Sequence, residues 1–353
     1  MMPIDERCAI ATRVGGVDVA RKTNRRGFVK VAGLAASGLM AGPLAGAAEP
    51  QARQTSQARP APSTMGARFR ALLNGPEPLI CPGAYDVLTA RLIEVHGFKA
   101  AFVGSSAPNQ ELVALPDQAI VTVSEIITYN GVIASNVDIP ILADVDDFGA
   151  TPLNVYRFAK EAERAGIGCA AFDDRMPINR ATAYNVPGVF PKARMIDNIH
   201  AAADARTEMV LIARCLAPTP NNSYAEMLDR AAAYAEAGAD AVWIGLPTAQ
   251  DYVGAADMIK KPLMAVIGGA NFPATAAAMK AARVAVGQSA SMVSIALGAI
   301  DKALVELKTT GRMTEAQKGA LSREMSDKVE QVEELNTRSQ KYNLPRASAP
   351  ERR

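Results

Sequence analysis

The sequence predicts a (β/α)8 barrel with an extra C-terminal helix, and three observations support this α/β fold class. From residue 79 onward, short runs of β-branched and apolar residues alternate with Ala-rich helical stretches, and eight such pairs fit into about 230 residues. Several of the runs are apolar throughout, as expected when both faces of a parallel strand are covered. No G-x-G-x-x-G segment follows the first run, which disfavours the alternative of an open, doubly wound sheet.

Each expected strand leads through a turn into an expected helix. The expected strands are 79–82, 100–104, 139–144, 168–172, 209–214, 241–245, 262–267 and 283–287. The expected helices are 84–96, 122–135, 152–165, 191–205, 223–237, 248–259, 273–281 and 289–308. Gly97, Gly166 and Gly238 end three of these helices, as is usual at a helix C-terminus. The barrel domain is therefore placed at 66–310, and residues 311–353 form a polar tail with a helical segment over 314–342.

The first 48 residues have the features of a twin-arginine export signal. Arg25 and Arg26 are followed by Phe28 and Lys30, and residues 31–48 then run without a charge to small residues suited to cleavage. A membrane anchor is the alternative, but glycines and a proline make this run a poor membrane-spanning helix. We expect a periplasmic or secreted protein with no stable membrane span after cleavage, in which residues 49–65 form a flexible linker.

Composition excludes several function classes. The 353 residues include 38 Lys and Arg against 36 Asp and Glu, which disfavours nucleic-acid binding because such domains are usually strongly basic. The only histidines are His96 and His200, so a three-histidine zinc site is impossible, and both are expected away from the strand ends. Beyond the signal, Cys81, Cys169 and Cys215 lie in or beside apolar runs, which predicts three buried thiols rather than disulfides.

Acidic side chains follow two neighbouring strands. Asp144, Asp146 and Asp147 end the third strand, and Asp173 and Asp174 end the fourth. The C-terminal strand ends of a barrel share one mouth, and alternation along the strand would put Asp144 and Asp146 on the same side. Carboxylates so close repel one another unless a cation intervenes, and oxygen ligands suit Mg²⁺ or Mn²⁺. Helix capping and solvated loop acids are the alternative, above all for Asp147 and Asp174.

Arg214 ends the fifth strand, after four apolar residues. A charge at this position is unfavourable unless it is paired or faces a ligand. Arginine can hold a substrate carboxylate or phosphonate through two parallel hydrogen bonds. A salt bridge to one of the acids is the alternative.

From about residue 66 to 310, the chain resembles the isocitrate lyase / phosphoenolpyruvate mutase superfamily, in its 2-methylisocitrate lyase-like branch. The matching stretches lie at 82–86, 115–117, 141–146, 152–155, 162–166, 212–214 and 234–241. Together they cover most of the barrel. The resemblance implies a catalytic (β/α)8 domain that uses Mg²⁺ (or Mn²⁺).

The resemblance also implies roles for individual residues. The metal would be held, partly through water, by Asp144 and Asp146 of the A-D-x-D segment and by Asp173, which is one methylene shorter than the superfamily's Glu. Asp117, from the L-P-D segment, would lie near metal and substrate and act in catalysis together with Arg214. Arg214 would hold the acid group of the substrate. Substrate contacts are also expected from Ser105 and Ser106, which follow the second strand.

The function implied is that of a Mg-dependent lyase that cleaves a C–C bond in a small 2-oxo or 2-hydroxy carboxylic acid through a metal-stabilised enolate. A P–C-cleaving or mutase reaction is a variant of this hypothesis. A non-catalytic or altered-chemistry periplasmic binding protein on the same barrel is the alternative, followed by another reaction class. The superfamily exchanges a C-terminal helix between subunits, so a homo-oligomer, dimer or tetramer, that depends on residues 314–342 is expected.

Several superfamily residues are replaced here. The stretch 179–183 reads N-R-A-T-A where the lyase branch carries a loop with a catalytic Cys and a His, so catalysis by that thiol is not expected. A superfamily Ser near the second strand falls at Gly104, the Glu of the sixth strand at Gly245, and an Asn of the seventh at Val266. The metal corner is therefore better preserved than the substrate corner, which indicates a substrate that differs from the familiar ones.

Overall fold

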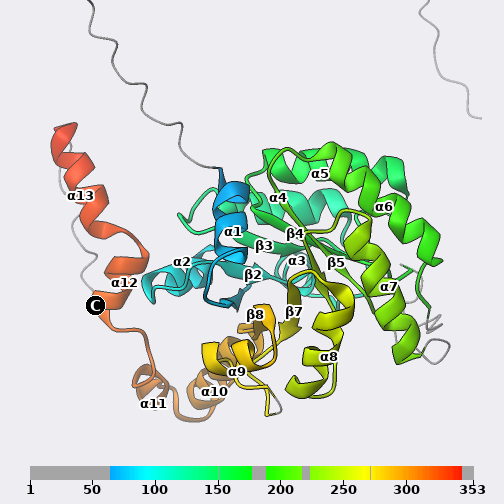
Figure 1. Cartoon of the computed structure of the whole chain (residues 1–353). Helices are drawn as coiled ribbons and strands as arrows, with labels where there is room; N and C mark the ends of the chain where they lie inside the picture. Colours follow the sequence, from blue (N-terminus) through cyan, green and yellow to red (C-terminus); the bar gives the residue numbers. More distant parts are fainter. Residues whose placement is uncertain (1–63, 150, 177–187, 217–222, 271, 344–353) are drawn as a thin grey trace, which may run out of the picture. The chain divides into compact units, whose positions relative to one another are not determined.

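Eight parallel strands close into a barrel in sequence order (Figure 1). The computed structural model describes residues 64–149, 151–176, 188–216, 223–270 and 272–343. Its strands are β1 Leu79–Ala84, β2 Ala101–Val103, β3 Ile141–Asp144, β4 Cys169–Asp173, β5 Val210–Arg214, β6 Ala241–Trp243, β7 Leu263–Val266 and β8 Val284–Ser291. The predicted (β/α)8 barrel is confirmed, and every predicted strand overlaps an observed one. The export signal, the linker to residue 63 and the stretch 179–183 lie outside the described residues.

A helix follows each strand, at the predicted place. These helices are α2 Val87–Val95, α4 Val123–Ala134, α5 Pro152–Arg164, α6 Lys192–Ala205, α7 Tyr224–Glu236, α8 Ala249–Ile259, α9 Ala276–Ala281 and α10 Val293–Thr310. Local side chains fix their starts. In α4, Thr122 accepts a hydrogen bond from the Glu125 N–H and Glu125 accepts one from the Thr122 N–H, which satisfies two free backbone donors. In α5, Thr151 caps the helix and Pro152 occupies its first turn, where no N–H is needed.

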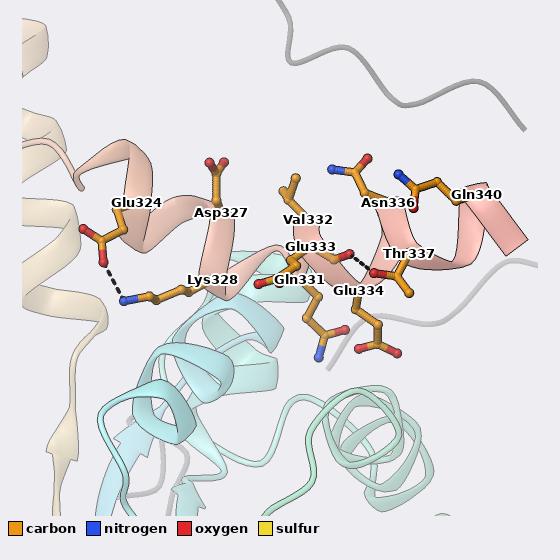
Figure 2. Close-up of a pocket in the computed structure, with 10 residues that line it drawn as sticks. All are labelled: Glu324, Asp327, Lys328, Gln331, Val332, Glu333, Glu334, Asn336, Thr337 and Gln340. Atoms are coloured by element: carbon orange, nitrogen blue, oxygen red, sulfur yellow. Dashed lines mark hydrogen bonds and ion pairs between the residues drawn. The ribbon is translucent and has the colours of Figure 1, made fainter.

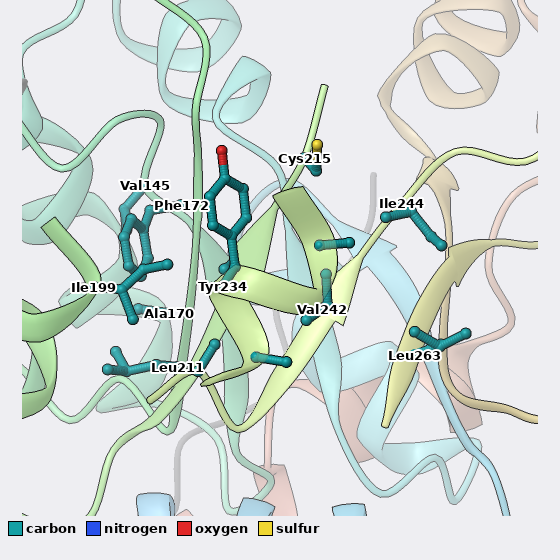
Figure 3. Packing of buried hydrophobic residues seen from close by; sticks show 14 of the residues in the cluster. Val145, Ala170, Phe172, Ile199, Leu211, Cys215, Tyr234, Val242, Ile244 and Leu263 are labelled. Carbon is teal, nitrogen blue, oxygen red and sulfur yellow. The ribbon is translucent and has the colours of Figure 1, made fainter. Parts of the chain in front are cut away.

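The strand side chains alternate between two layers. The outward layer packs under the helices (Figure 3) and includes Val145, Ala170, Phe172, Leu211, Val242, Ile244 and Leu263. The inward layer fills the barrel and includes Cys81, Phe102, Leu142, Ala171, Ile212, Trp243, Met264 and Val286. Because the alternation is regular, the residues that continue the inward layer at the C-terminal strand ends face the mouth of the barrel.

An additional helix, α1 (Met65–Leu73), covers the N-terminal end of the barrel. Phe69 and Leu73 are buried among the inward-facing residues. A Cβ atom on Gly66 would come within 2.6 Å of the Glu208 carbonyl oxygen, so only glycine allows this close approach. The barrel interior is thereby closed at this end, which leaves the C-terminal mouth for a ligand.

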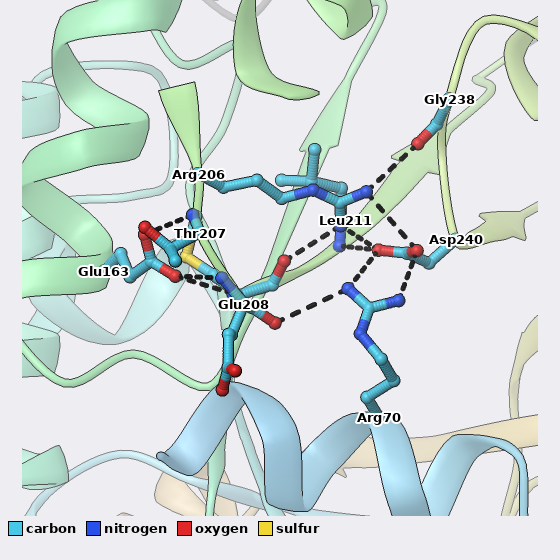
Figure 4. A network of polar contacts seen from close by, with 9 residues as sticks. Arg70, Glu163, Arg206, Thr207, Glu208, Leu211, Gly238 and Asp240 are labelled. Atoms are coloured by element: carbon cyan, nitrogen blue, oxygen red, sulfur yellow. Dashed lines mark hydrogen bonds and ion pairs between the residues drawn. The ribbon is translucent and has the colours of Figure 1, made fainter. Parts of the chain in front are cut away.

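A polar network joins α1 to the barrel (Figure 4). Arg70 donates to Asp240 over 2.6 Å, and Arg206 also donates to Asp240. Burial raises the pKa of the Asp240 carboxyl, but the bonds from the two arginines and from the Leu211 N–H outweigh burial and hold the pKa below its ordinary value. Beside them, Glu163 accepts three backbone N–H groups from residues 207–209, which fixes the turn before β5.

The tail forms three helices where one helical segment was expected. They are α11 Thr314–Gln317, α12 Arg323–Val329 and α13 Val332–Lys341. Gln331, with φ of 57°, separates the last two. Within the described part of the tail, to residue 343, Val329 is the buried residue, and Arg91 of α2 donates to its carbonyl over 3.4 Å. A polar hollow lies along α12 and α13 (Figure 2), and none of its lining residues belongs to a strand end. None of the helices in the described ranges is both long and apolar enough to cross a membrane.

Candidate active site

Three charged side chains continue the inward layer at neighbouring strand ends. Asp144 follows inward-facing Leu142 on β3, and Asp173 and Arg214 lie opposite each other in the register of β4 and β5. Asp144 and Asp173 are buried, at 4% and 0% exposure. The structure therefore brings together these predicted residues at one side of the mouth.

The backbone of Asp146 contacts both Asp144 and Asp173, but Asp146 does not continue the strand as predicted. Strand β3 ends at Asp144, and Asp146 has a left-handed backbone with φ of 57°, so the prediction from strand alternation is wrong for this residue. Its N–H donates to Asp144 Oδ1 over 3.2 Å, and its carbonyl accepts the Asp173 N–H over 2.7 Å. A non-glycine residue in this conformation is strained, and such strain concentrates at functional sites.

Arg214 is held between an acid and an aromatic ring. Its Nη1 donates to Asp144 Oδ2 over 3.1 Å, which confirms the salt-bridge alternative. Its guanidinium lies 3.8 Å from the centre of the Trp243 ring, and Phe102 meets Trp243 edge to face. A quarter of the Arg214 side chain stays exposed. The guanidinium is thus fixed in place and accessible to an acid group.

Asp174 is buried behind the mouth and ties three elements together. It accepts the Leu216 N–H over 2.9 Å and the Tyr234 hydroxyl over 2.8 Å, and Arg230 lies 3.8 Å away. Its own N–H donates to the Arg214 carbonyl, over 3.2 Å. Burial raises the pKa of the Asp174 carboxyl, against the effect of its two hydrogen-bond donors. Asp174 therefore connects α7 to the ends of β4 and β5.

The predicted serine and aspartate sites after β2 lie close together. The hydroxyl of Ser105 donates to Asp117 Oδ2 over 3.2 Å, and Ser106 begins α3 (Ser106–Val113). Buried Asn109 holds this segment, because its amide nitrogen donates to the Ser105 carbonyl and its oxygen accepts the Val121 N–H. The Ser105–Asp117 pair is thereby fixed beside the second strand.

The carboxylates at the mouth are ligands of the kind that a hard cation prefers, but they do not form a complete coordination shell. Asp144, Asp146 and Asp173 supply carboxylate oxygens, which Mg²⁺ and Mn²⁺ prefer. Across the described ranges, no three His, Cys, Asp or Glu side chains gather closely enough to hold a metal ion. Arg214 also occupies one oxygen of Asp144. The residues therefore fit a cation that takes one or two protein oxygens directly and the rest from water and substrate.

The remaining sequence predictions concern residues away from the mouth. His96 is the exposed C-cap of α2, and His200 is exposed on α6, as expected. Cys81, Cys169 and Cys215 are buried free thiols, which confirms that prediction.

Sequence reasoning missed Trp243, Asn109 and the Asp174 network. The position of Trp243, two residues before the end of the predicted sixth strand, was a usable signal because it continues the inward pattern of Ala241. The partners of Asp174 lie 42 and 60 residues away and carry no sequence pattern.

Comparisons with known proteins point to one family. The family described as "Phosphoenolpyruvate phosphomutase" matches residues 69–308. 2,3-Dimethylmalate lyase of Eubacterium barkeri is 29% identical over 187 residues, which are 52% of this chain and 64% of that enzyme. Probable 2-methylisocitrate lyase 2 of Corynebacterium glutamicum is 28% identical over 263 residues, which are 72% of this chain and 84% of the relative. The match thus spans just under two thirds of the first relative and more of the second.

Solved structures share the fold. A phosphonopyruvate hydrolase, solved in complex with oxalate and Mg²⁺, superposes with a TM-score of 0.68. It is 25% identical, and the superposition covers 80% of this chain and 100% of that structure. The likeness therefore extends over the full length of that structure.

Proposed function

Because the chain belongs to the phosphoenolpyruvate phosphomutase family, we propose that it is a lyase that cleaves a C–C bond in a small 2-oxo or 2-hydroxy carboxylic acid with the help of Mg²⁺ or Mn²⁺. The observation that carries the proposal is the fixed guanidinium of Arg214, held by Asp144 and Trp243 at the mouth of the barrel. The related lyases and the oxalate complex of the hydrolase support an acid as the ligand.

In this proposal, separate residues bind the substrate, hold the cation and line the site. Arg214 binds the acid group of the substrate through its guanidinium N–H groups, and Asp144 and the Trp243 ring keep it oriented. Asp144, Asp146 and Asp173 would hold the cation together with water. When bound, the cation would supply Lewis-acid stabilisation of negative charge that develops on the substrate. Ser105 and Asp117 would line the site next to the acids, because they follow β2, which pairs with β3.

Trp243 provides the test, because it is the only tryptophan of the chain and lies against Arg214. We expect small 2-oxo and 2-hydroxy acids to change its fluorescence in the presence of Mg²⁺, and Arg214→Met to weaken that binding at least tenfold. Lys192→Met, at an exposed surface ion pair, is the control. Turnover of a bound acid, followed by mass spectrometry, would identify the lyase, and phosphonopyruvate in the same set tests the P–C variant. Binding without turnover would favour the binding-protein alternative, and no binding of any acid would refute the proposal.

The metal is tested separately by thermal unfolding. Mg²⁺ or Mn²⁺ should raise the melting temperature of the wild type, since a ligand that prefers the folded state stabilises it. Asp144→Ala should abolish that increase, whereas Asp138→Ala, at an exposed position before β3, should keep it. If calorimetry detects no metal binding to the wild type with or without a 2-hydroxy acid, the metal part of the proposal fails.

Export and assembly complete the proposal. We propose that Arg25 and Arg26 direct the chain to the twin-arginine pathway and that it acts in the periplasm or outside the cell. We further propose a homo-oligomer. The expected dependence on residues 314–342 belongs to this proposal, and α10 adds support, because Val293 alone of its residues is buried and large apolar side chains are exposed.

A further inference from the structure

The backbone after β4 turns away from β5 directly beyond the charged corner of the site. Asp173 and Arg214 lie opposite each other in the last step of the β4–β5 register. The next residue, Asp174, still donates its N–H to the Arg214 carbonyl over 3.2 Å, but its own carbonyl accepts the Phe190 N–H over 2.6 Å. The chain after β4 thus pairs with residues 188–190, and the regular ladder to β5 ends at this point.

The side chain of Asp174 takes the place of its engaged carbonyl. In a regular parallel ladder that carbonyl would accept the Leu216 N–H, but the carboxylate Oδ1 accepts it instead, over 2.9 Å. On the other side of β5, the Cys215 N–H donates to the Trp243 carbonyl over 2.9 Å. Asp174 therefore keeps the chain on both sides of Cys215 attached to β4, and with it the backbone that carries Arg214.

Tyr234 of α7 holds this carboxylate from the outward layer of the barrel (Figure 3). Its buried hydroxyl donates to Asp174 Oδ2 over 2.8 Å and accepts a hydrogen bond from Arg230 Nη1 over 3.3 Å. Burial and the negative charge of Asp174 raise the pKa of the Tyr234 hydroxyl, so the hydroxyl stays protonated and can donate. One hydroxyl on an outer helix thus sets the direction of the carboxylate.

We propose that Tyr234 is a positioning residue whose hydroxyl, acting through Asp174, keeps Arg214 where its guanidinium can bind the acid group of the substrate. The inference rests on the proposed function, in which Arg214 binds that group. Without the hydroxyl, the carboxylate can turn toward the Arg230 guanidinium, 3.8 Å from Oδ2, and away from the Leu216 N–H. The chain at Arg214 would then be held less tightly, and a displaced guanidinium loses the paired hydrogen bonds that an acid group needs.

The ligand-free protein provides the first test, because Trp243 reports on the guanidinium that lies 3.8 Å from the centre of its ring. Tyr234→Phe removes the hydroxyl and keeps the aromatic ring. We expect it to shift the fluorescence emission of Trp243, the single tryptophan of the chain, toward that of Arg214→Met. In the Arg214→Met background the same substitution should leave the emission unchanged, because no guanidinium is left to displace. A general loosening of the fold would shift the emission in both backgrounds.

Acid binding provides the second test. Calorimetry in the presence of Mg²⁺ would measure the binding of pyruvate, lactate and malate, and Tyr234→Phe should weaken the tightest of these by about tenfold. The matched control is Tyr129→Phe, which removes a hydroxyl that donates to the Tyr85 carbonyl after β1, on the side of the barrel opposite β5. It should change neither the acid affinity nor the emission of Trp243.

Asp174→Asn serves as a second variant if Tyr234→Phe does not fold, because one amide oxygen cannot face both the Leu216 N–H and the Tyr234 hydroxyl. An acid affinity or a Trp243 emission that stays at its wild-type value would overturn the inference and leave the proposed function standing. Equal emission shifts in the two backgrounds would also overturn it. If the wild type binds none of the three acids, the proposed function fails, and the emission of the ligand-free variants still decides whether Tyr234 positions Arg214.

Discussion

Asp174 is a completely buried carboxylate, and the hydrogen bonds that it accepts offset the free-energy cost of removing it from water. Removing it would leave the Leu216 N–H and the Tyr234 hydroxyl without their acceptor and would take a nearby carboxylate away from the Arg230 guanidinium. We therefore expect Asp174→Ala to lower the free energy of unfolding by about 3 kcal/mol. Urea denaturation measures this change. Asp204→Ala, an exposed acid on α6, should change the free energy by less than about 0.5 kcal/mol. Equal effects of the two substitutions would contradict the assigned role of the buried network.

At the same scale, the sequence predicted the charged corner of the site but not its supports. Asp144, Asp173 and Arg214 were identifiable because each interrupts or ends an apolar run at a strand end. Asp146 was predicted to continue the strand, but it follows the end of β3 with a left-handed backbone that alternation could not foresee. Partners such as Tyr234 depend on how α7 packs, which no local pattern encodes.

At the scale of elements, α1 depends on one carboxylate. Asp240 accepts bonds from Arg70 on α1 and from Arg206 at the end of α6 (Figure 4). The pKa of the Asp240 carboxyl is lower in the folded protein than in the unfolded chain. The ionised carboxylate therefore stabilises the fold fully above the ordinary aspartate pKa of about 3.9. This stabilisation is lost as the pH falls through the lower pKa of the folded protein. The wild type should therefore lose stability below about pH 4 more steeply than Asp240→Asn.

Urea midpoints measured between pH 7 and pH 2.5 test this pH dependence. Asp204→Asn, which changes an exposed acid, should follow the wild-type curve. A wild-type curve that runs parallel to that of Asp240→Asn would show that the carboxylate carries no such stabilisation.

The predicted strands and helices of the barrel were found because a barrel repeats one sequence pattern. Every strand–helix pair was found, since apolar runs alternate with amphipathic helices over the entire domain. The helices α1 and α3 were not predicted, because α1 begins where the sequence still reads as linker and α3 occupies an expected loop. The tail was read as one helical segment, and the left-handed Gln331 that divides it had no sequence signal.

At the scale of the whole molecule, the exposed apolar side chains of α10 indicate that copies of the chain associate. Ile295, Ile300 and Leu304 are 76%, 53% and 57% exposed, and exposed apolar surface of this kind marks an interaction site. We expect full-length protein to be oligomeric by light scattering. Replacing these three residues together by Glu should lower the mass toward that of the monomer, and Lys302→Glu on the same helix should not. A monomeric wild type would contradict the prediction.

Export is also a property of the entire chain. Replacing Arg25 and Arg26 by Lys should leave the protein in the cytoplasm, because the twin-arginine route requires the arginine pair. Cell fractionation followed by immunoblotting measures the distribution, and replacement of Arg13 by Lys, outside the pair, is the control. Normal periplasmic levels of the double variant would show that another route is used.

The bond between Arg70 and Asp240 has a consequence for the order of folding. It joins residues 170 positions apart, so α1 leaves the ribosome long before the site that receives it has been made. Until β5 and the start of β6 are in place, Phe69 and Leu73 have no interior to enter, so α1 docks after strands that are synthesised later. Pulsed hydrogen exchange during refolding should accordingly find the amides of α1 protected after those of β3 to β5. Docking of α1 would then mark the point at which β5 and the start of β6 are in place, before β8 closes the barrel on β1.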